Sequence, residues 1–199
     1  MARLSVGGHE FHYFEREGDG PPILMLCSTG LDSRQWNDFV QLVPSRRIIC
    51  PHYLCYPKSD GWNGDGSIDS GLDYLAAEEI LLREDGPVDV LGHSYGGFIG
   101  LRLAKEHPER IRRIAIHEPT VWGCLQHTDR DELKNDFGEV VETFFTEGLG
   151  PEEFLKDFVD YWKVEGSWDS MPGATEDVWV AIQPEITRAG EPVLCCETT

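Results

Sequence analysis

A glycine-flanked serine between an apolar strand and an amphipathic helix constrains this chain more than any other feature. It lies in the stretch DVLGHSYGGFIGLRLAKEHPERIRRIAIHEP, residues 89–119, and the turn GHSYG centres on Ser94. A chain that passes abruptly from strand to helix puts the serine in a strained conformation and needs small flanking residues, here Gly92 and Gly96. Such a turn exposes the serine hydroxyl at the carboxyl end of the strand, as a nucleophile requires.

Apolar runs alternate with helical patterns on both sides of this turn. Short runs bounded by breakers predict buried strands at Ile23–Cys27, Arg47–Cys50, Val88–Leu91 and Ile111–Ile116. Apolar spacings of three and four predict helices at Trp36–Val43, Leu72–Leu81 and Tyr95–His107. Period-two alternation around Gly7-Gly8 predicts a hairpin over residues 2–16. The fold class is therefore α/β, a mostly parallel, doubly wound sheet with an N-terminal antiparallel hairpin.

The composition changes after Pro119 to acidic amphipathic segments, with helices predicted at 133–145, 154–164 and 178–186. Residues 1–117 hold 12 basic and 17 acidic side chains, whereas residues 118–199 hold 5 and 19. The net charge of −19 repels nucleic acid and anionic membranes, so we expect no partner of either kind.

The chain shows no export signal and no apolar stretch of membrane-spanning length, so a cytoplasmic location is expected. Its six cysteines are accordingly predicted to be reduced core residues. A zinc site at Cys50, His52 and Cys55 is an alternative, but no fourth ligand follows in spacing and Cys50 belongs to a buried strand. We therefore predict no metal and no cofactor.

Three segments together resemble the α/β-hydrolase superfamily in order and spacing. They are LMLCSTGLDSRQW at 24–36, IICPHYLCYPKSD at 48–60, and residues 88–119. The resemblance implies Ser94 as nucleophile, in an elbow of Gly92, His93 and Gly96. It also implies an oxyanion hole made by the backbone N–H groups of Thr29 and Tyr95.

The same resemblance implies a domain organisation. Residues 1–118 are expected to form the hydrolase core and residues 119–190 a helical cap that shapes the substrate pocket. Residues 191–199 are expected to be either the end of the cap or the start of a further core strand.

A serine hydroxyl needs a histidine base, which in turn needs a carboxylate, and in this family the chain order is serine, acid, histidine. Glu118 occupies a position from which some members supply the acid. His127 is the only histidine beyond residue 117, and it comes too early for the family's base, while His9, His12 and His107 are expected at the surface. We therefore expect the final strands and the histidine loop to be lacking, as in a fragment, a truncated product or a chain completed by a partner.

That expectation leaves the strand Ile111–Ile116 as an apolar sheet edge, so we expect self-association there or cover by the C-terminal segment. Two functional hypotheses remain. One is a serine hydrolase acting on a small ester, lactone or similar acyl substrate. Serine rather than aspartate at the elbow argues against a haloalkane dehalogenase. The other is a non-catalytic homologue that works as a binding or interaction module.

Overall fold

The computed structural model describes residues 2–56, 58–61, 71–127, 130–135 and 151–172. The chain divides into two compact units, Met1–Thr120 and Val121–Thr199. Each unit is described by itself below. That the second unit acts as a cap remains a prediction.

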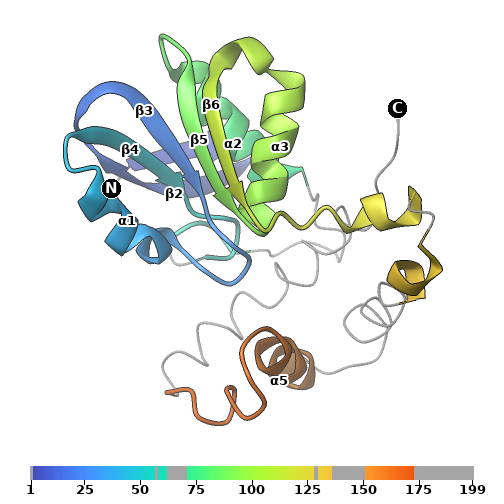
Figure 1. Ribbon diagram of the computed structural model, residues 1–199. Coiled ribbons are helices and arrows are strands. Elements are labelled where there is room, and N and C mark those ends of the chain that lie inside the picture. Colours follow the sequence, from blue (N-terminus) through green and yellow to red (C-terminus); the bar gives the residue numbers. More distant parts are fainter. Residues whose placement is uncertain (1, 57, 62–70, 128–129, 136–150, 173–199) are drawn as a thin grey trace. The chain divides into compact units, whose positions relative to one another are not determined.

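A six-stranded sheet forms the centre of the first unit (Figure 1). Its strands are β1 (Ala2–Val6), β2 (His9–Arg16), β3 (Asp19–Leu26), β4 (Arg46–Pro51), β5 (Val88–His93) and β6 (Ile111–His117). The order is β1-β2-β4-β3-β5-β6, with β1, β2 and β4 joined by antiparallel pairing and β4, β3, β5 and β6 by parallel pairing. The predicted α/β class and the N-terminal hairpin are therefore confirmed. Among the described strands, β6 is the edge strand opposite β1.

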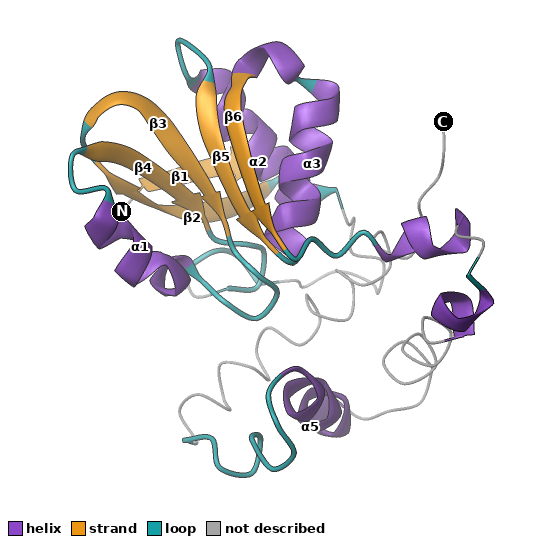
Figure 2. Cartoon of the chain, viewed as in Figure 1, coloured by secondary structure: helices purple, strands orange, loops and turns teal. Residues whose placement is uncertain are grey.

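Three α-helices of the described part of the first unit flank this sheet and are drawn in purple in Figure 2. They are α1 (Asn37–Leu42), which follows a 3₁₀ turn at Ser33–Trp36, α2 (Leu72–Arg83) and α3 (Tyr95–Glu106). Figure 1 shows α2 and α3 together and α1 apart from them. The apolar face of α3, which includes Ile99 and Leu103, is buried, as its spacing predicts. All three predicted helices are present, with small shifts at their ends.

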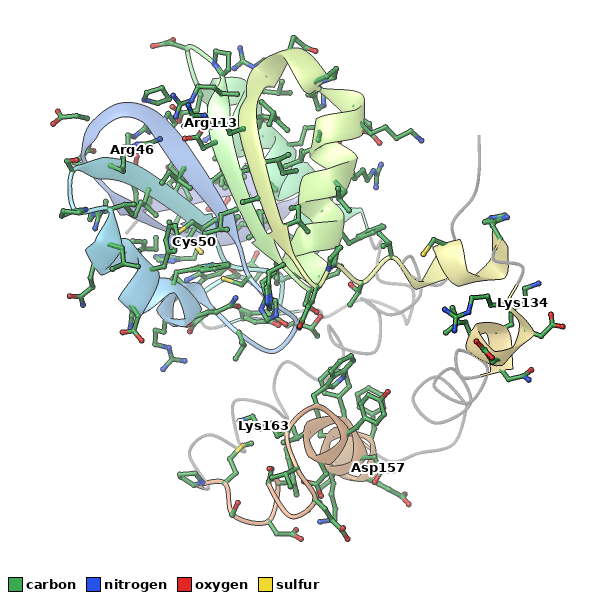
Figure 3. All side chains as sticks on the ribbon, in the orientation of Figure 1. Arg46, Cys50, Arg113, Lys134, Asp157 and Lys163 are labelled. Atoms are coloured by element: carbon green, nitrogen blue, oxygen red, sulfur yellow. The ribbon has the colours of Figure 1, made fainter. Side chains whose placement is uncertain are left out.

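The cysteine prediction holds for only part of the described chain. Cys27 and Cys50 are buried, with their Sγ atoms 3.5 Å apart, and Figure 3 shows Cys50 inside the first unit. Burial and the neighbouring Cys27 thiol raise the pKa of Cys50. Cys55 is half-buried and Cys124 is exposed, so the expectation of a core position is wrong for Cys124.

The second unit contains a 3₁₀ turn at Trp122–His127, a helical segment at 131–135 and α5 (Pro151–Trp162). α5 starts three residues before the predicted helix and buries Phe154, Leu155 and Val159. The rest of the predicted helix 133–145, the helix 178–186 and the segment 191–199 lie outside the described residues. Within the described part of the chain, no helix combines the length and apolarity that crossing a membrane requires.

Candidate active site

Ser94 occupies a sharp turn between the end of β5 and the start of α3. Its backbone angles are φ 54° and ψ −119°. This is the mirror image of the extended region, which glycine enters freely and other residues enter only under strain, at a cost of about 1–3 kcal/mol. The strained turn expected from the sequence is therefore present. Strain of this kind persists only where surrounding contacts enforce it.

Glycine is required on both sides of this turn because backbone atoms approach closely. A Cβ on Gly96 would lie 2.3 Å from the carbonyl carbon and oxygen of Leu26, at the end of β3. A Cβ on Gly92 would lie 2.6 Å from the carbonyl oxygen of Gly96. Main-chain atoms cannot move aside as a side-chain tip can, so any side chain here would push the helix away from the sheet.

The start of α3 is tied directly to the loop that follows β3. The N–H of Gly96 donates to the carbonyl oxygen of Cys27 over 2.9 Å, and the Tyr53 hydroxyl donates to the same oxygen over 2.6 Å. Burial raises the pKa of Tyr53 well above its usual value, which keeps the phenol protonated as a donor. The two segments predicted to form the oxyanion hole are therefore held together by short contacts.

The predicted oxyanion loop, Cys27–Gly30, is also fastened on both sides of Thr29. The N–H of Ser28 donates to Gln35 Oε1 over 2.9 Å, and the N–H of Gly30 donates to the Tyr56 hydroxyl. Among the residues that the structure describes, the N–H of Thr29 has no acceptor. The loop therefore presents one spare donor between two anchored peptide groups, as an oxyanion hole requires.

A buried hydrogen-bond network around Asp73 connects α2 to the segment after β4 and to the turn at Ser94. Asp73, only 1% exposed, accepts a hydrogen bond from the Tyr95 hydroxyl over 3.1 Å and one from the N–H of Leu54 over 3.0 Å. The Tyr95 ring lies edge-on to Tyr53, with 5.2 Å between centroids. Asp73 joins the helix α2 to the elbow. Its role could not be recognised from the sequence, because an acid in the first turn of a helix is common on protein surfaces.

The end of β6 lies beside the elbow. The N–H of Ser94 donates to the carbonyl oxygen of His117 over 3.0 Å. Glu118 is the next residue in the chain, so its backbone lies close to the elbow. Glu118 has a positive φ of 46°, and its side chain is 76% exposed. His117 was also missed by sequence analysis, although the strand register pairs it with His93. Its Nε2 lies 3.9 Å from Glu118 Oε1.

His93 is oriented by a neighbour other than the serine. Gln35 Nε2 and His93 Nδ1 are 2.9 Å apart, and the ring centroids of His93 and His117 are 5.1 Å apart. Burial and the nearby His117 lower the pKa of His93, and Glu118 opposes them. Within the described chain, no side chain hydrogen-bonds the Ser94 hydroxyl.

Donor atoms of His93, His117 and Glu118 lie within 4.8 Å of one another, which raises the question of a metal. The Gln35 amide donates to Nδ1 of His93, so the neutral ring carries its proton on Nε2. Neither nitrogen then offers a free lone pair, and we interpret the three side chains as a polar cluster. Cys50, His52 and Cys55, the alternative zinc ligands, do not bring their donor atoms together in the described chain.

The remaining described histidines lie elsewhere. His52 is buried and its Nε2 lies 3.0 Å from the Ser33 hydroxyl. His12, expected at the surface, is only 4% exposed, because β2 pairs with β4 and places it against His52. His127 is exposed in the second unit.

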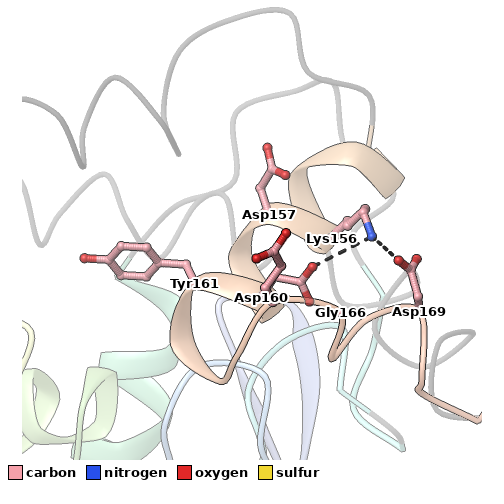
Figure 4. Close-up of a pocket in the computed structure, with 7 residues that line it drawn as sticks. Lys156, Asp157, Asp160, Tyr161, Gly166 and Asp169 are labelled. Carbon is pink, nitrogen blue, oxygen red and sulfur yellow. Dashed lines mark hydrogen bonds and ion pairs between the residues drawn. The ribbon is translucent and has the colours of Figure 1, made fainter.

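The second unit has a hollow beside α5, lined mainly by charged side chains (Figure 4). Lys156 pairs with Asp160 and Asp169 there, at 3.8 and 2.5 Å. Asp160 also accepts the N–H of Trp168 over 2.8 Å. Lys156 and the Asp160 contact with Trp168 join α5 to the turn that follows it, so the hollow has a structural explanation.

The family of this chain follows from comparison with known proteins. The model of the alpha/beta hydrolase fold family matches residues 21–159, which is more than half of the chain. The match includes the predicted oxyanion loop, the turn at Ser94 and β6. The chain therefore belongs to the α/β-hydrolase fold family, as its sequence motifs suggested.

Two curated relatives are hydrolases. A 2-hydroxymuconate semialdehyde hydrolase of Pseudomonas sp. (strain CF600) is 33% identical over 108 residues, 50% of this chain and 36% of that protein. Lipase LipV of Mycobacterium tuberculosis (strain ATCC 25618 / H37Rv) is 31% identical over 112 residues, 55% of this chain and 42% of that protein. The chain thus matches less than half of either relative's length.

Solved structures support the fold. A crystal structure of the N-acyl homoserine lactonase AidH, complexed with N-butanoyl homoserine, superimposes with a TM-score of 0.67 at 16% identity. The similarity covers 97% of this chain and 69% of the lactonase. At this identity the likeness concerns the fold alone.

Proposed function

We propose that the protein is a serine hydrolase of the α/β-hydrolase family that acts on a small ester, lactone or similar acyl substrate. The observation that carries this proposal is the strained turn at Ser94, with φ 54° and ψ −119° and close backbone contacts on both sides. A turn that costs free energy is retained where it presents a reacting group. That two curated relatives are hydrolases supports the same reaction class.

In this mechanism the Ser94 oxygen attacks the acyl carbon while its proton passes to a histidine base, and the N–H groups of Thr29 and Tyr95 bind the oxyanion of the tetrahedral intermediate. Collapse of this intermediate expels the protonated alcohol and leaves an acyl-serine ester, which water then hydrolyses. Tyr95 begins α3, where the helix dipole also favours negative charge. Glu118 would be the acid that orients a histidine base, since it follows the residue that contacts the elbow. The histidine itself is unassigned among the described residues.

A second candidate is a homologue that binds its ligand without turning it over. The observation in its favour is that no described side chain hydrogen-bonds the Ser94 hydroxyl. A serine without a base is a weak nucleophile at neutral pH.

Reaction with a fluorophosphonate probe separates the two candidates. We expect covalent labelling of the folded protein, complete loss of labelling in Ser94→Ala, and no loss in Ser45→Ala, which alters an exposed serine on a loop. Circular dichroism would verify that both variants are folded. Absence of labelling in the folded parent protein would refute the hydrolase proposal and favour the binding module.

A further inference from the structure

Gln35 connects the predicted oxyanion loop to the residue before the nucleophile. It lies in the 3₁₀ turn that precedes α1 and is half-buried. Its Oε1 accepts the N–H of Ser28 over 2.9 Å, and its Nε2 lies 2.9 Å from His93 Nδ1. One amide group thus contacts the loop after β3 and the end of β5 together. The residues it contacts are the immediate neighbours of Thr29 and Ser94.

The direction of these two hydrogen bonds defines the state of the His93 ring. A backbone N–H can only donate, so the amide oxygen must face Ser28 and the NH₂ group must face His93. Nδ1 of His93 then accepts, and the proton of the neutral ring lies on Nε2. A protonated His93 would point a second donor at the amide NH₂ and break the contact.

The charged and titratable groups that face His93 come from β6 and the residue after it. They are His117, with its ring 5.1 Å away, and Glu118. Burial of the ring and the proximity of His117 disfavour the protonated form, while Glu118 favours it. The net direction keeps His93 neutral near pH 7, as the hydrogen bond with Gln35 requires.

We propose that Gln35 is a positioning residue that holds the oxyanion loop in register with the nucleophile elbow, through the N–H of Ser28 and neutral His93. The proposal rests on the proposed hydrolase function, because it is the oxyanion hole that this contact would align. Thr29 follows Ser28 directly, so a rotation of the peptide group that carries the Ser28 N–H also displaces the N–H of Thr29. Oxyanion donors act only within a narrow range of positions.

Two variants separate the two halves of this contact. Gln35→Glu keeps an acceptor for Ser28 but replaces the donor to His93 with a carboxylate, which favours a proton on Nδ1. Gln35→Leu removes both hydrogen bonds. Gln41→Leu makes the same change at an exposed position of α1 and is the matched control.

The first readout needs no catalysis. NMR titration should show a His93 pKa that is raised in Gln35→Glu and unchanged in Gln41→Leu. Amide hydrogen exchange of Ser28 should be faster by at least about tenfold in Gln35→Leu, because its hydrogen bond is lost. Unchanged exchange at Ser28 in Gln35→Leu, or an unchanged His93 pKa in Gln35→Glu, would overturn the proposal, since each predicted hydrogen bond would then be absent in solution.

The second readout is the rate of Ser94 labelling by a fluorophosphonate. We expect Gln35→Leu to lower the rate constant about 10- to 100-fold, less than the loss of a whole oxyanion donor. In Gln35→Glu the His93 ring can donate from Nδ1 to the carboxylate, most strongly when it is protonated below its raised pKa, so this variant should label closer to the parent's rate than Gln35→Leu as the pH falls, whereas Gln41→Leu should match the parent. Labelling rates equal to the parent in both Gln35 variants would overturn the positioning role. Absence of labelling in the parent would refute the hydrolase function alone, and the exchange and pKa measurements would still decide whether the contact exists.

Discussion

Replacement of Ser94 by glycine should stabilise the protein relative to replacement by alanine. Alanine keeps the strained backbone of the turn without the hydroxyl, whereas glycine adopts φ 54° and ψ −119° without a Cβ clash. The strain relieved is about 1–3 kcal/mol. Glycine also costs about 0.5–1 kcal/mol through the greater freedom of the unfolded chain. The net gain expected for Ser94→Gly over Ser94→Ala is therefore about 1 kcal/mol.

A matched pair of variants at Ser45 removes the unfolded-state contribution. Ser45 is exposed, lies in a loop and is not among the residues with positive φ, so glycine there carries the entropic cost without relief of strain. Ser45→Gly should be less stable than Ser45→Ala by about 0.5–1 kcal/mol. The difference between the two glycine-minus-alanine values then measures the strain at Ser94 alone.

Urea unfolding followed by tryptophan fluorescence gives the four free energies of unfolding. A double difference of about 1–3 kcal/mol is expected, and a change of 1 kcal/mol corresponds to a shift of roughly 2–4 °C in Tm for a chain of this size. A double difference near zero would refute the argument that the turn stores strain. It would also remove the observation on which the proposed nucleophile depends.

Two further predictions concern pH and association. Burial, followed by the charges of His52 and Lys58, lowers the pKa of His12 below its usual 6.5. The unfolded state then binds more protons near pH 6, so stability is complete above about pH 6.5 and is lost as the pH falls toward the folded pKa. His12→Phe should lessen the fall in Tm between pH 7 and 5, and an equal fall in parent and variant would contradict this origin. Self-association through the outer edge of β6, where Ile114 is 40% exposed, should weaken in Ile114→Lys but not in Leu101→Lys, which alters an exposed residue of α3. Light scattering that finds the parent monomeric at high concentration would disprove this association.

Much of the first unit could be predicted because its signals are local. The apolar run of β3 and the helical spacing of α3 depend only on neighbouring residues, and both elements are where they were expected. The glycines around Ser94 were equally informative, since the need for them arises within a few residues of the turn. Boundaries differed by a few residues, as with α5, because capping and packing decide where a helix ends.

The predictions that were wrong or absent all depend on contacts between distant segments. His12 was taken for a surface residue, but pairing of β2 with β4 buries it. Asp73 was missed, because only the packing of α2 against the elbow brings its carboxylate to the Tyr95 hydroxyl. His117 was missed for the same reason, since its position beside the elbow follows from the register of β5 and β6.

The sequence by itself determined that this chain has an α/β fold and that Ser94 lies on a strand-to-helix turn, because apolar periodicity and the conformational freedom of glycine act over a few residues. Only the tertiary structure decided which polar groups meet around that serine. Gln35 and His93 are 58 positions apart, and their hydrogen bond exists because β3 and β5 are adjacent in the sheet. Strand order of this kind is set by burial of the whole core, which no single segment encodes.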